Sequence, residues 1–266
     1  MPKYNYSCRW RVIIMPHVKV KDLELFYEKM GTGEPVIFLH SSYSRGLLAF
    51  SSQILDFQNK YTCYFIDFRG HGRTRCKSLE WSTPQLADDI AAFMDCMSIE
   101  KAHLIGYSMG ANVGLYLAVN DPARVATLTT IGTGGFCNPA GAEDFEPERL
   151  LELEQQGIIR QMKERHEEAH LGNWQEFMRQ SATDWRRYPD LSEAQLSSIG
   201  CPVLIIAGEH DTYAAADKII QLVSLIKGSQ CLIVPGAGHP PHMGREQPVL
   251  VNDTILEFLA KNSNLK

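Results

Sequence analysis

Residues 103–119 read HLIGYSMGANVGLYLAV, and this stretch decides how the rest of the sequence is interpreted. The apolar run at 103–105 predicts a buried strand, and the apolar periodicity at 111–119 predicts a helix. The two are joined by the pattern G-x-S-x-G, with glycines at 106 and 110. A strand that turns sharply into a helix leaves little room for side chains at these two positions, so the pattern fits a tight strand–turn–helix junction.

The junction presents Ser108 as a candidate nucleophile. The turn forces this serine into strained backbone angles and lifts its hydroxyl clear of the sheet. The backbone N–H of Met109 then lies at a helix N-terminus, where it can donate to a developing oxyanion. Because G-x-S-x-G alone occurs in many unrelated sequences, it is the preceding strand and the following helix that favour a catalytic role.

A serine hydroxyl needs a base to remove its proton, and the sequence offers nine histidines. His239 follows the apolar run 231–234 in a glycine-rich loop, which places it at the same sheet edge as Ser108. His242 is the alternative base, three residues further along the chain. The junction between strand and loop favours His239.

The base in turn needs a carboxylate to orient its ring. Asp211 comes just after the apolar run 203–207, whereas the preceding run ends at Ile131-Gly132-Thr133 without a carboxylate. Glu209 is the competing acid and is interpreted as an exposed loop residue. We therefore predict Asp211 as the acid of a triad in the order serine, aspartate, histidine.

The remaining sequence predicts an α/β fold with a mostly parallel, eight-stranded sheet covered by helices. Short, nearly continuously apolar runs are typical of strands buried on both faces, and they lie at 36–39, 64–66, 125–131, 203–207 and 231–234. Helical periodicity lies between them at 47–57, 86–97, 218–226 and 249–259. The alternating pattern from Val18 to Tyr27 predicts an antiparallel hairpin before them.

One stretch, 134–199, is polar and helix-like and breaks this alternation. We predict a helical cap inserted into a core made of 1–133 and 200–266, over the sheet edge where ligands bind in open α/β folds. A second apolar stripe in this stretch consists of Trp174, Phe177, Met178 and Trp185. Packing is the simpler explanation of that stripe, and the alternative is that Trp174 and Phe177 wall a substrate pocket.

From Met15 onward the chain resembles the α/β-hydrolase superfamily, in its lipase, esterase and haloperoxidase-like branch. The motifs that carry the resemblance are FLHSS at 38–42, DFRGHGRT at 67–74, GYSMG at 106–110, GEHD at 208–211 and GAGH at 236–239. In this order and spacing they are specific for the fold and not for a substrate. Residues 1–14 precede the pattern, and we expect them to add little.

The resemblance implies that a second oxyanion donor is a backbone N–H in the loop after His40, and we assign it to Ser42. The family usually has His-Gly where this chain has His40-Ser41, so Ser41 stays the alternative donor. Ser41 and Tyr107 are candidate pocket residues, together with Trp174.

Composition argues against several function classes. The chain has 266 residues, of which 26 are basic and 31 acidic, and no cluster of Lys and Arg interleaved with aromatics predicts nucleic-acid binding. No apolar run is long enough to predict a membrane span or a secretory signal, so we expect a cytoplasmic protein. The seven cysteines show no metal-ligand spacing, and Cys63 and Cys231 lie in apolar runs where we expect buried thiols. No metal or organic cofactor is implied, and the oligomeric state stays open.

The function predicted from these residues is hydrolysis of small to medium carboxylic esters through a Ser108 acyl-enzyme. The same apparatus serves carbon–carbon bond hydrolysis, enol-lactone opening, thioester cleavage and perhydrolysis. In the family, haloalkane dehalogenases and epoxide hydrolases have aspartate at the nucleophile position, which argues against both. The alternative from another class is a ligand-sensing protein that uses the pocket for recognition.

Overall fold

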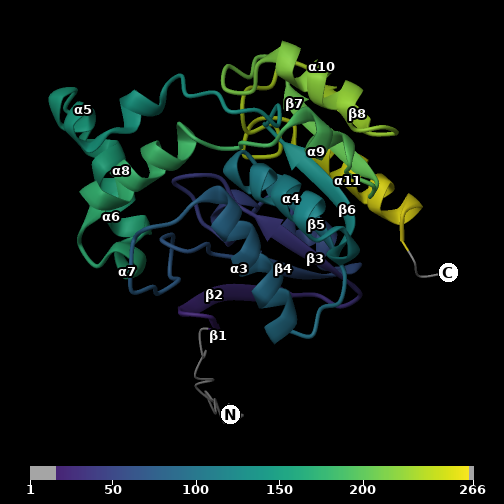
Figure 1. The fold of residues 1–266 in the computed structure, drawn as a ribbon, viewed down its shortest axis with the longest axis horizontal. Coiled ribbons are helices and arrows are strands. Elements are labelled where there is room, and N and C mark those ends of the chain that lie inside the picture. Colours follow the sequence, from purple (N-terminus) through teal and green to yellow (C-terminus); the bar gives the residue numbers. More distant parts are fainter. Residues whose placement is uncertain (1–15, 264–266) are drawn as a thin grey trace, which may run out of the picture.

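The computed structural model describes residues 16–263, which form a mostly parallel sheet of eight strands with helices on both faces (Figure 1). Its strands are β1 (His17–Val20), β2 (Leu23–Met30), β3 (Glu34–Leu39), β4 (Tyr61–Ile66), β5 (Ala102–Tyr107), β6 (Val125–Ile131), β7 (Val203–Gly208) and β8 (Gln230–Val234). Their spatial order is β1-β2-β4-β3-β5-β6-β7-β8. The β1–β2 and β2–β4 pairs are antiparallel and the others are parallel. The predicted fold class and the N-terminal hairpin are confirmed.

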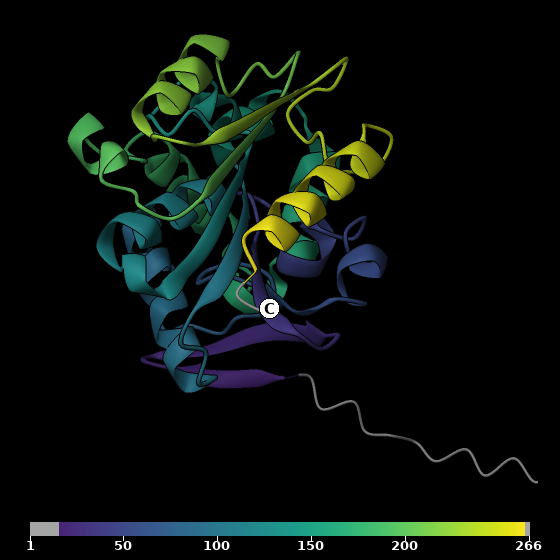
Figure 2. The ribbon, with the colours of Figure 1, turned by 90° about the vertical axis from the view of Figure 1, so that its right-hand side faces the viewer.

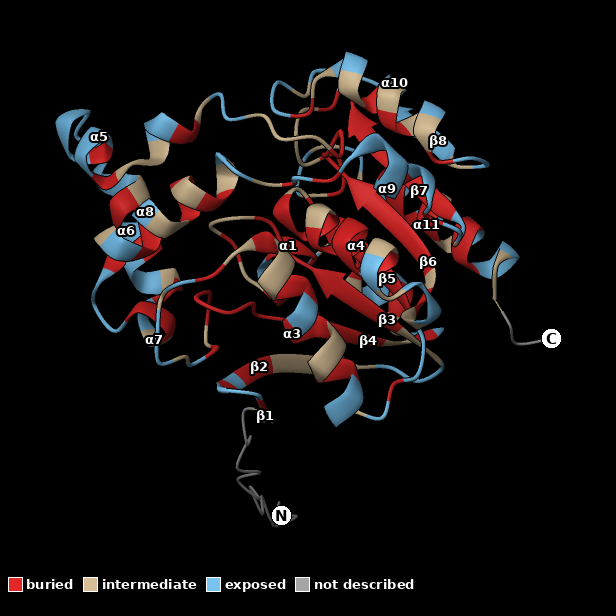
Figure 3. Ribbon diagram, viewed as in Figure 1, coloured by how far each residue is buried: buried red, intermediate tan, exposed pale blue. Residues whose placement is uncertain are grey.

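The central strands are buried on both faces of the sheet (Figure 3). Successive side chains of a strand point to opposite faces, so each central strand contributes to both apolar clusters. In β3, Ile37 and Leu39 join one apolar cluster, while Val36 and Phe38 join the other. The first face is covered by α3 (Thr83–Cys96), α4 (Met109–Asn120) and α10 (Ala216–Leu225), and the second by α1 (Gly46–Ala49), α2 (Ile54–Phe57) and α11 (Pro248–Lys261). Figure 2 shows α11, in yellow, on the opposite side of the sheet from α4.

The edge strand β8 differs from its prediction. Its apolar sequence predicted burial on both faces, but Val234 is its one buried residue, and Cys231 and Ile233 are exposed. The predicted burial of Cys231 is therefore wrong, whereas Cys63 in β4 is buried as predicted. The physical reason is position: β8 pairs with β7 alone, so the layers that cover the sheet centre leave its margin partly open.

Two predicted helices have different limits in the structure. The helix expected at 47–57 is divided into α1 and α2, because residues 50–53 form turns that include Ser51 and Ser52, which are poor residues for a helix interior. Helix α3 is capped by Ser82, whose side chain accepts a hydrogen bond from the Gln85 N–H at 3.3 Å. Thr83 is therefore the first helical residue, and its own N–H has no acceptor within the helix.

The stretch 134–199 is helical, as expected of an insertion, and contains no strand. Its elements are η2 (Ala142–Phe145), α5 (Pro147–Glu152), α6 (Gln156–Arg165), α7 (Glu167–His170), α8 (Trp174–Trp185) and α9 (Glu193–Ser197). Helices α5 to α8 gather at one side of the sheet (Figure 1), whereas α9 packs against α4 and α10. The exact division into a core and a cap at 133/134 and 199/200 stays a prediction.

Two further predictions concern membrane association and the N-terminus. Within residues 16–263, no helix is long and apolar enough to span a bilayer. The expectation that residues 1–14 add little lies outside the described residues.

Candidate active site

The turn between β5 and α4 has the strained geometry that its sequence predicts. Ser108 has φ 53° and ψ −117°, in a region that residues other than glycine rarely adopt. A Cβ on Gly106 would lie 2.4 Å from the Gly110 oxygen, and one on Gly110 would lie 2.0 Å from the Leu39 oxygen. Side chains at these positions would therefore prevent the close packing that fixes Ser108 at the end of β5.

His239 and Asp211 meet Ser108 at the carboxyl edge of the sheet. The His239 Nε2 lies 3.1 Å from the Ser108 Oγ, and its Nδ1 lies 2.9 Å and 3.0 Å from the two oxygens of Asp211. Because an ionised carboxylate can only accept hydrogen bonds, Nδ1 carries the proton and Nε2 is free to accept the Ser108 O–H. The structure brings the three predicted residues together, and their catalytic roles remain a proposal.

The environment of Asp211 keeps its carboxylate ionised. Burial raises its pKa, but the hydrogen bond from His239 and those from the backbone N–H groups of Ala214 and Tyr213 outweigh burial, so that the pKa is lowered overall. Both N–H groups lie 2.9 Å from Oδ1. A carboxylate held in this way can stabilise the positive charge that forms on the His239 ring during proton transfer.

The alternative base, His242, and the alternative acid, Glu209, do not lie beside Ser108. His242 is fully buried, and its Nε2 is 3.1 Å from the Ala49 carbonyl oxygen. Burial lowers the pKa of His242 to about 3, so it stays neutral, and it does not line the cavity beside Ser108. Glu209 is exposed and accepts a hydrogen bond from the Gly236 N–H at 2.8 Å.

The residues predicted to supply the oxyanion donors, Met109 and Ser42, both line the cavity that Ser108 lines. Met109 is the first residue of α4, where backbone N–H groups lack partners within the helix. Ser42 lies in a turn closed by the Ser44 N–H and the Ser41 carbonyl oxygen at 3.3 Å, and Tyr43 there has φ 61°. His40 fixes this turn by donating from Nδ1 to the same Ser41 oxygen at 2.8 Å.

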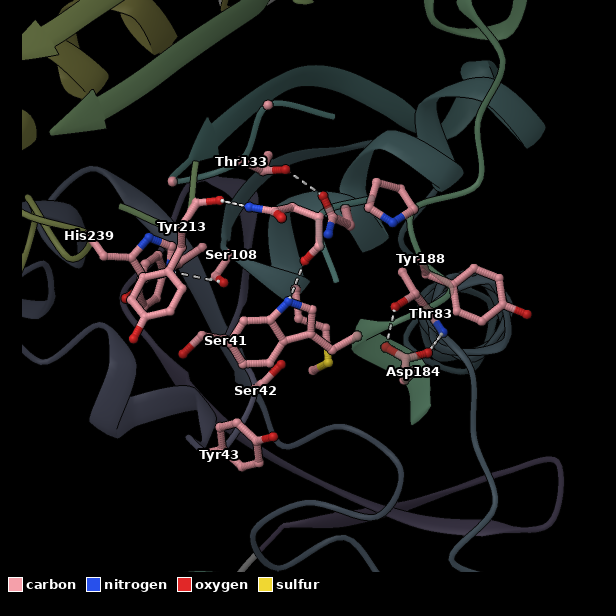
Figure 4. Close-up of a pocket in the computed structure, with 18 of the residues that line it drawn as sticks. Ser41, Ser42, Tyr43, Thr83, Ser108, Thr133, Asp184, Tyr188, Tyr213 and His239 are labelled. Carbon is pink, nitrogen blue, oxygen red and sulfur yellow. Dashed lines mark hydrogen bonds between the residues drawn. The ribbon is translucent and has the colours of Figure 1, made fainter. Parts of the chain in front are cut away.

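A cavity of about 220 Å³ opens beside Ser108 (Figure 4). Its lining includes the predicted residues Ser41, Ser42, Tyr107, Ser108, Met109 and His239. Trp185 of the predicted apolar stripe also lines it. The lining further includes residues that sequence reasoning missed, among them Tyr43, Thr83, Asn112, Asp184 and Tyr213. The side chains come from the sheet edge, from the start of α3 and from the cap helix α8.

The lining residues that sequence reasoning missed differ in how far the sequence motifs pointed to them. Tyr213 lies two residues after Asp211, and its ring centroid is 5.0 Å from that of His239. Asn112 lies four residues after Ser108, which is one helical turn along α4. These two positions could have been found from the motifs, whereas Asp184 lies in the cap and no motif marks it.

Trp174 and Phe177 do not line the cavity, so the expectation that they wall a substrate pocket is wrong. Phe177 is fully buried, stacks on His166 with ring centroids 4.4 Å apart, and packs 5.6 Å from Trp81 of the core. Trp174 is also buried and carries Lys163 over its ring. Both belong to the packing between cap and core, which was the simpler explanation of the stripe.

The side chains present do not form a metal centre: no group of three or more His, Cys, Asp or Glu in the described part of the chain has a ligand arrangement. The site is therefore a serine, a histidine and an aspartate at a cavity of mixed polarity. This arrangement can deprotonate a hydroxyl, form a covalent intermediate and place N–H donors near it.

The chain is similar to known hydrolases over most of its length. It is 27% identical to 2-hydroxy-6-oxononadienedioate/2-hydroxy-6-oxononatrienedioate hydrolase 2 from Pseudomonas putida, across 90% of this chain and 92% of the relative. Its fold matches a thermophilic esterase from Thermogutta terrifontis with a TM-score of 0.76 and 24% identity, covering 93% of this chain and 99% of that one. The enol-lactonase from Burkholderia xenovorans LB400 matches with a TM-score of 0.72 and 22% identity, covering 92% and 100%. A family model described as alpha/beta hydrolase fold matches residues 34–182, more than half of the chain, and the protein therefore belongs to the α/β-hydrolases.

Proposed function

We propose that this α/β-hydrolase cleaves small to medium carboxylic esters through an acyl-enzyme on Ser108. The observation that carries the proposal is the continuous relay from Asp211 through His239 to Ser108, with separations of 2.9 Å and 3.1 Å at the cavity wall. Each separation is within the range that proton transfer and ring orientation require.

In the proposed reaction, the Ser108 Oγ attacks the ester carbonyl carbon while the His239 Nε2 takes the hydroxyl proton. The carbonyl electrons move to oxygen, and the N–H groups of Met109 and Ser42 donate to that oxyanion. The intermediate collapses as the alcohol leaves with the proton from His239. Water, deprotonated by the same nitrogen, then attacks the acyl-enzyme and releases the acid and the free serine.

The charge of the cavity supports substrates without an anionic group near the scissile bond. No Lys or Arg occurs among its lining residues in the described part of the chain. A substrate carboxylate in the cavity would therefore be desolvated without a cationic partner, at a cost of several kcal/mol. Neutral esters avoid this cost.

Carbon–carbon bond hydrolysis is the second candidate, and the similarity to the Pseudomonas dioate hydrolase over 90% of this chain favours it. The absence of a cation in the described lining argues against a substrate as anionic as a dioate. Turnover of neutral p-nitrophenyl esters against a vinylogous 1,5-diketone acid separates the two candidates. Faster hydrolysis of the diketone acid would contradict the ester proposal.

The triad itself is tested by single and double substitutions. Ser108→Ala and His239→Ala should each lower kcat on an ester by about 10⁴-fold or more, and the double variant should lose little beyond either, because the residues act as a unit. Asp211→Asn should cost less than His239→Ala, since nucleophile and oxyanion donors remain.

A serine-directed phosphonate should label the native protein at Ser108 and fail on Ser108→Ala, as measured by mass spectrometry. Near-full ester hydrolysis by purified Ser108→Ala would refute the mechanism. A ligand-sensing protein with this fold would give at most one burst of product per chain, whereas an enzyme continues to turn over.

A further inference from the structure

A single carboxylate, that of Asp184, lines the cavity within the described residues. Asp184, near the end of α8, is buried and receives two hydrogen bonds from the first residue of α3. The Thr83 N–H donates to Oδ1 and the Thr83 hydroxyl donates to Oδ2, each at 2.7 Å. Figure 4 shows Asp184 and Thr83 across the cavity from Ser108 and His239.

The charge of Asp184 is not balanced by a cation. Burial raises its pKa to about 6, and the two hydrogen bonds from Thr83 only partly offset that effect. No Lys, Arg or His forms an ion pair with it among residues 16–263. Since a carboxylate has about four lone-pair sites and Thr83 uses two of them, Asp184 can accept further hydrogen bonds.

A second residue that lines the cavity, Tyr43, has a polar group without a hydrogen-bond partner in the described structure. The hydroxyl oxygen of Tyr43 is buried and has no hydrogen-bond partner in the described structure. Burial is the main cause that raises the pKa of Tyr43, and the charges of Glu146 and, to a smaller extent, Asp184 raise it further. Buried polar groups are normally hydrogen-bonded, and one that is unpaired at a cavity wall is a candidate contact for a ligand.

We propose that Asp184 accepts a hydrogen bond from a hydroxyl or ammonium group at the end of the substrate remote from the scissile carbonyl. This inference rests on the proposed ester hydrolysis and narrows its substrate class to esters with a donor group. The rest of the chain of such a substrate lies in a cavity whose walls include Phe136, Phe145 and Trp185.

The alternative is that Asp184 only joins the cap to the core through Thr83. A joint of this kind would alter the stability of the protein and the turnover of every substrate in the same proportion. A recognition role predicts a change in the ratio of kcat/KM between substrates of equal shape, because only the donor-bearing substrate contacts the carboxylate.

The test uses three matched p-nitrophenyl acyl esters that end in methyl, hydroxyl or ammonium, over a series of chain lengths. A second series places the same three groups on the alcohol side of acetate esters. The native protein should prefer the hydroxyl and ammonium esters over the methyl ester by about ten-fold at one chain length, as expected for a hydrogen bond to a charged group. No preference in either series would overturn the inference.

Two variants test whether Asp184 causes the preference for the hydroxyl and ammonium esters. Asp184→Asn keeps the shape of the side chain and should remove most of the ammonium preference while it retains turnover of the methyl ester. Asp88→Asn removes an exposed negative charge from α3, outside the cavity, and should leave the preference unchanged. If Asp184→Asn lowered kcat/KM by the same factor on all three esters, Asp184 would serve only to hold the cap to the core through Thr83.

The native protein supplies a measurement that needs no variant. Because the pKa of Asp184 is about 6, its ammonium preference should fall as pH falls through that value. The ratio of rates on the ammonium and methyl esters cancels the titration of the triad, which acts on both. A ratio that is constant across this range would contradict the role of the Asp184 charge.

The titratable groups that interact with Asp184 do not contribute to the pH dependence of this rate ratio. Tyr43 from the loop after β3, Tyr116 from α4 and Cys137 from the loop after β6 all interact with its charge. Burial raises the pKa of each of these three groups, so all stay neutral near pH 6. The nearby Arg186 forms an ion pair with Glu146, and neither residue lines the cavity.

A final measurement separates this inference from the proposed function. Two ether analogues, in which a methylene replaces the ester carbonyl, would be compared by calorimetry, one ending in ammonium and one in methyl. Tighter binding of the ammonium ether together with no hydrolysis of any ester would uphold recognition by Asp184 and refute ester hydrolysis. Equal binding of both ethers would refute the recognition, whatever the turnover.

Discussion

Replacing Asp184 by asparagine should stabilise the folded protein at neutral and alkaline pH. Its pKa is about 6 in the folded protein, against the ordinary value of 3.8 expected in the unfolded chain, and burial is the main cause. Between these values the folded protein holds a proton that the unfolded chain has released. The free energy of unfolding therefore falls as pH rises through this range, and it stays lower above it.

The difference between 3.8 and about 6 corresponds to about 3 kcal/mol. Asparagine does not titrate, so the free energy of unfolding of Asp184→Asn does not fall by this amount as pH rises. For a chain of this size, about 2 °C in Tm accompanies each kcal/mol, which predicts a Tm advantage of about 6 °C for the variant at pH 8. Below pH 4, where Asp184 is protonated in both states, the advantage should disappear.

The assay is urea or thermal unfolding of the native protein, Asp184→Asn and Asp88→Asn over a series of pH values. The exposed Asp88→Asn control should show a small, pH-independent difference from the native protein, since surface charges contribute little. A stability difference for Asp184→Asn that is the same at pH 5 and pH 8 would refute the raised pKa and the reasoning built on burial.

Three further predictions concern single positions. Gly132→Ala would place a Cβ 3.0 Å from the His239 ring at a residue with φ +66°, so kcat on esters should fall by about ten-fold or more, and an unchanged kcat would contradict this steric account. Phe177→Ala should lower the free energy of unfolding by about 3–5 kcal/mol in urea titrations, with the preference between short and long acyl esters retained. A shifted preference would place Phe177 at the pocket after all. In the folded protein, a maleimide should label the exposed Cys231 and spare the buried Cys63, as measured by mass spectrometry, and the reverse pattern would contradict the burial assigned to them.

The central strands could be predicted because burial on both faces leaves a signal within each strand. The runs that became β3, β4, β5 and β7 are mostly apolar, and β6 adds the buried threonines Thr127, Thr129 and Thr130 to apolar positions. The β8 run has the same character, yet Cys231 and Ile233 are exposed. Position within a sheet depends on which other strands pair with it, and a single run of residues does not encode its neighbours.

The candidate triad could be predicted for a related reason. Ser108 follows β5 directly, and Asp211 and His239 lie in the loops that follow β7 and β8. The carboxyl ends of such parallel strands meet at one edge. For the helices of the cap, no comparable rule relates position in the sequence to position at the site. In α8 the helical stripe identified both Phe177, which packs against the core, and Trp185, which lines the cavity, but not Asp184, which lines the cavity about two turns after Phe177. Periodicity assigns residues to a face of a helix, but it does not say what lies opposite that face.

The separation of the three triad residues along the chain has a consequence for folding. The hydrogen bond between His239 and Ser108 spans 131 residues of sequence, and β5 is connected to the β7–β8 pair of the sheet through β6. Contacts of such long range form late, because the entropy of closing large loops must be overcome before they contribute stability. On the ribosome, Ser108 is synthesised long before His239. Under the proposed mechanism, the growing chain therefore has no base for Ser108 until its last strand has docked, and catalytic competence would arise in the same step that completes the sheet.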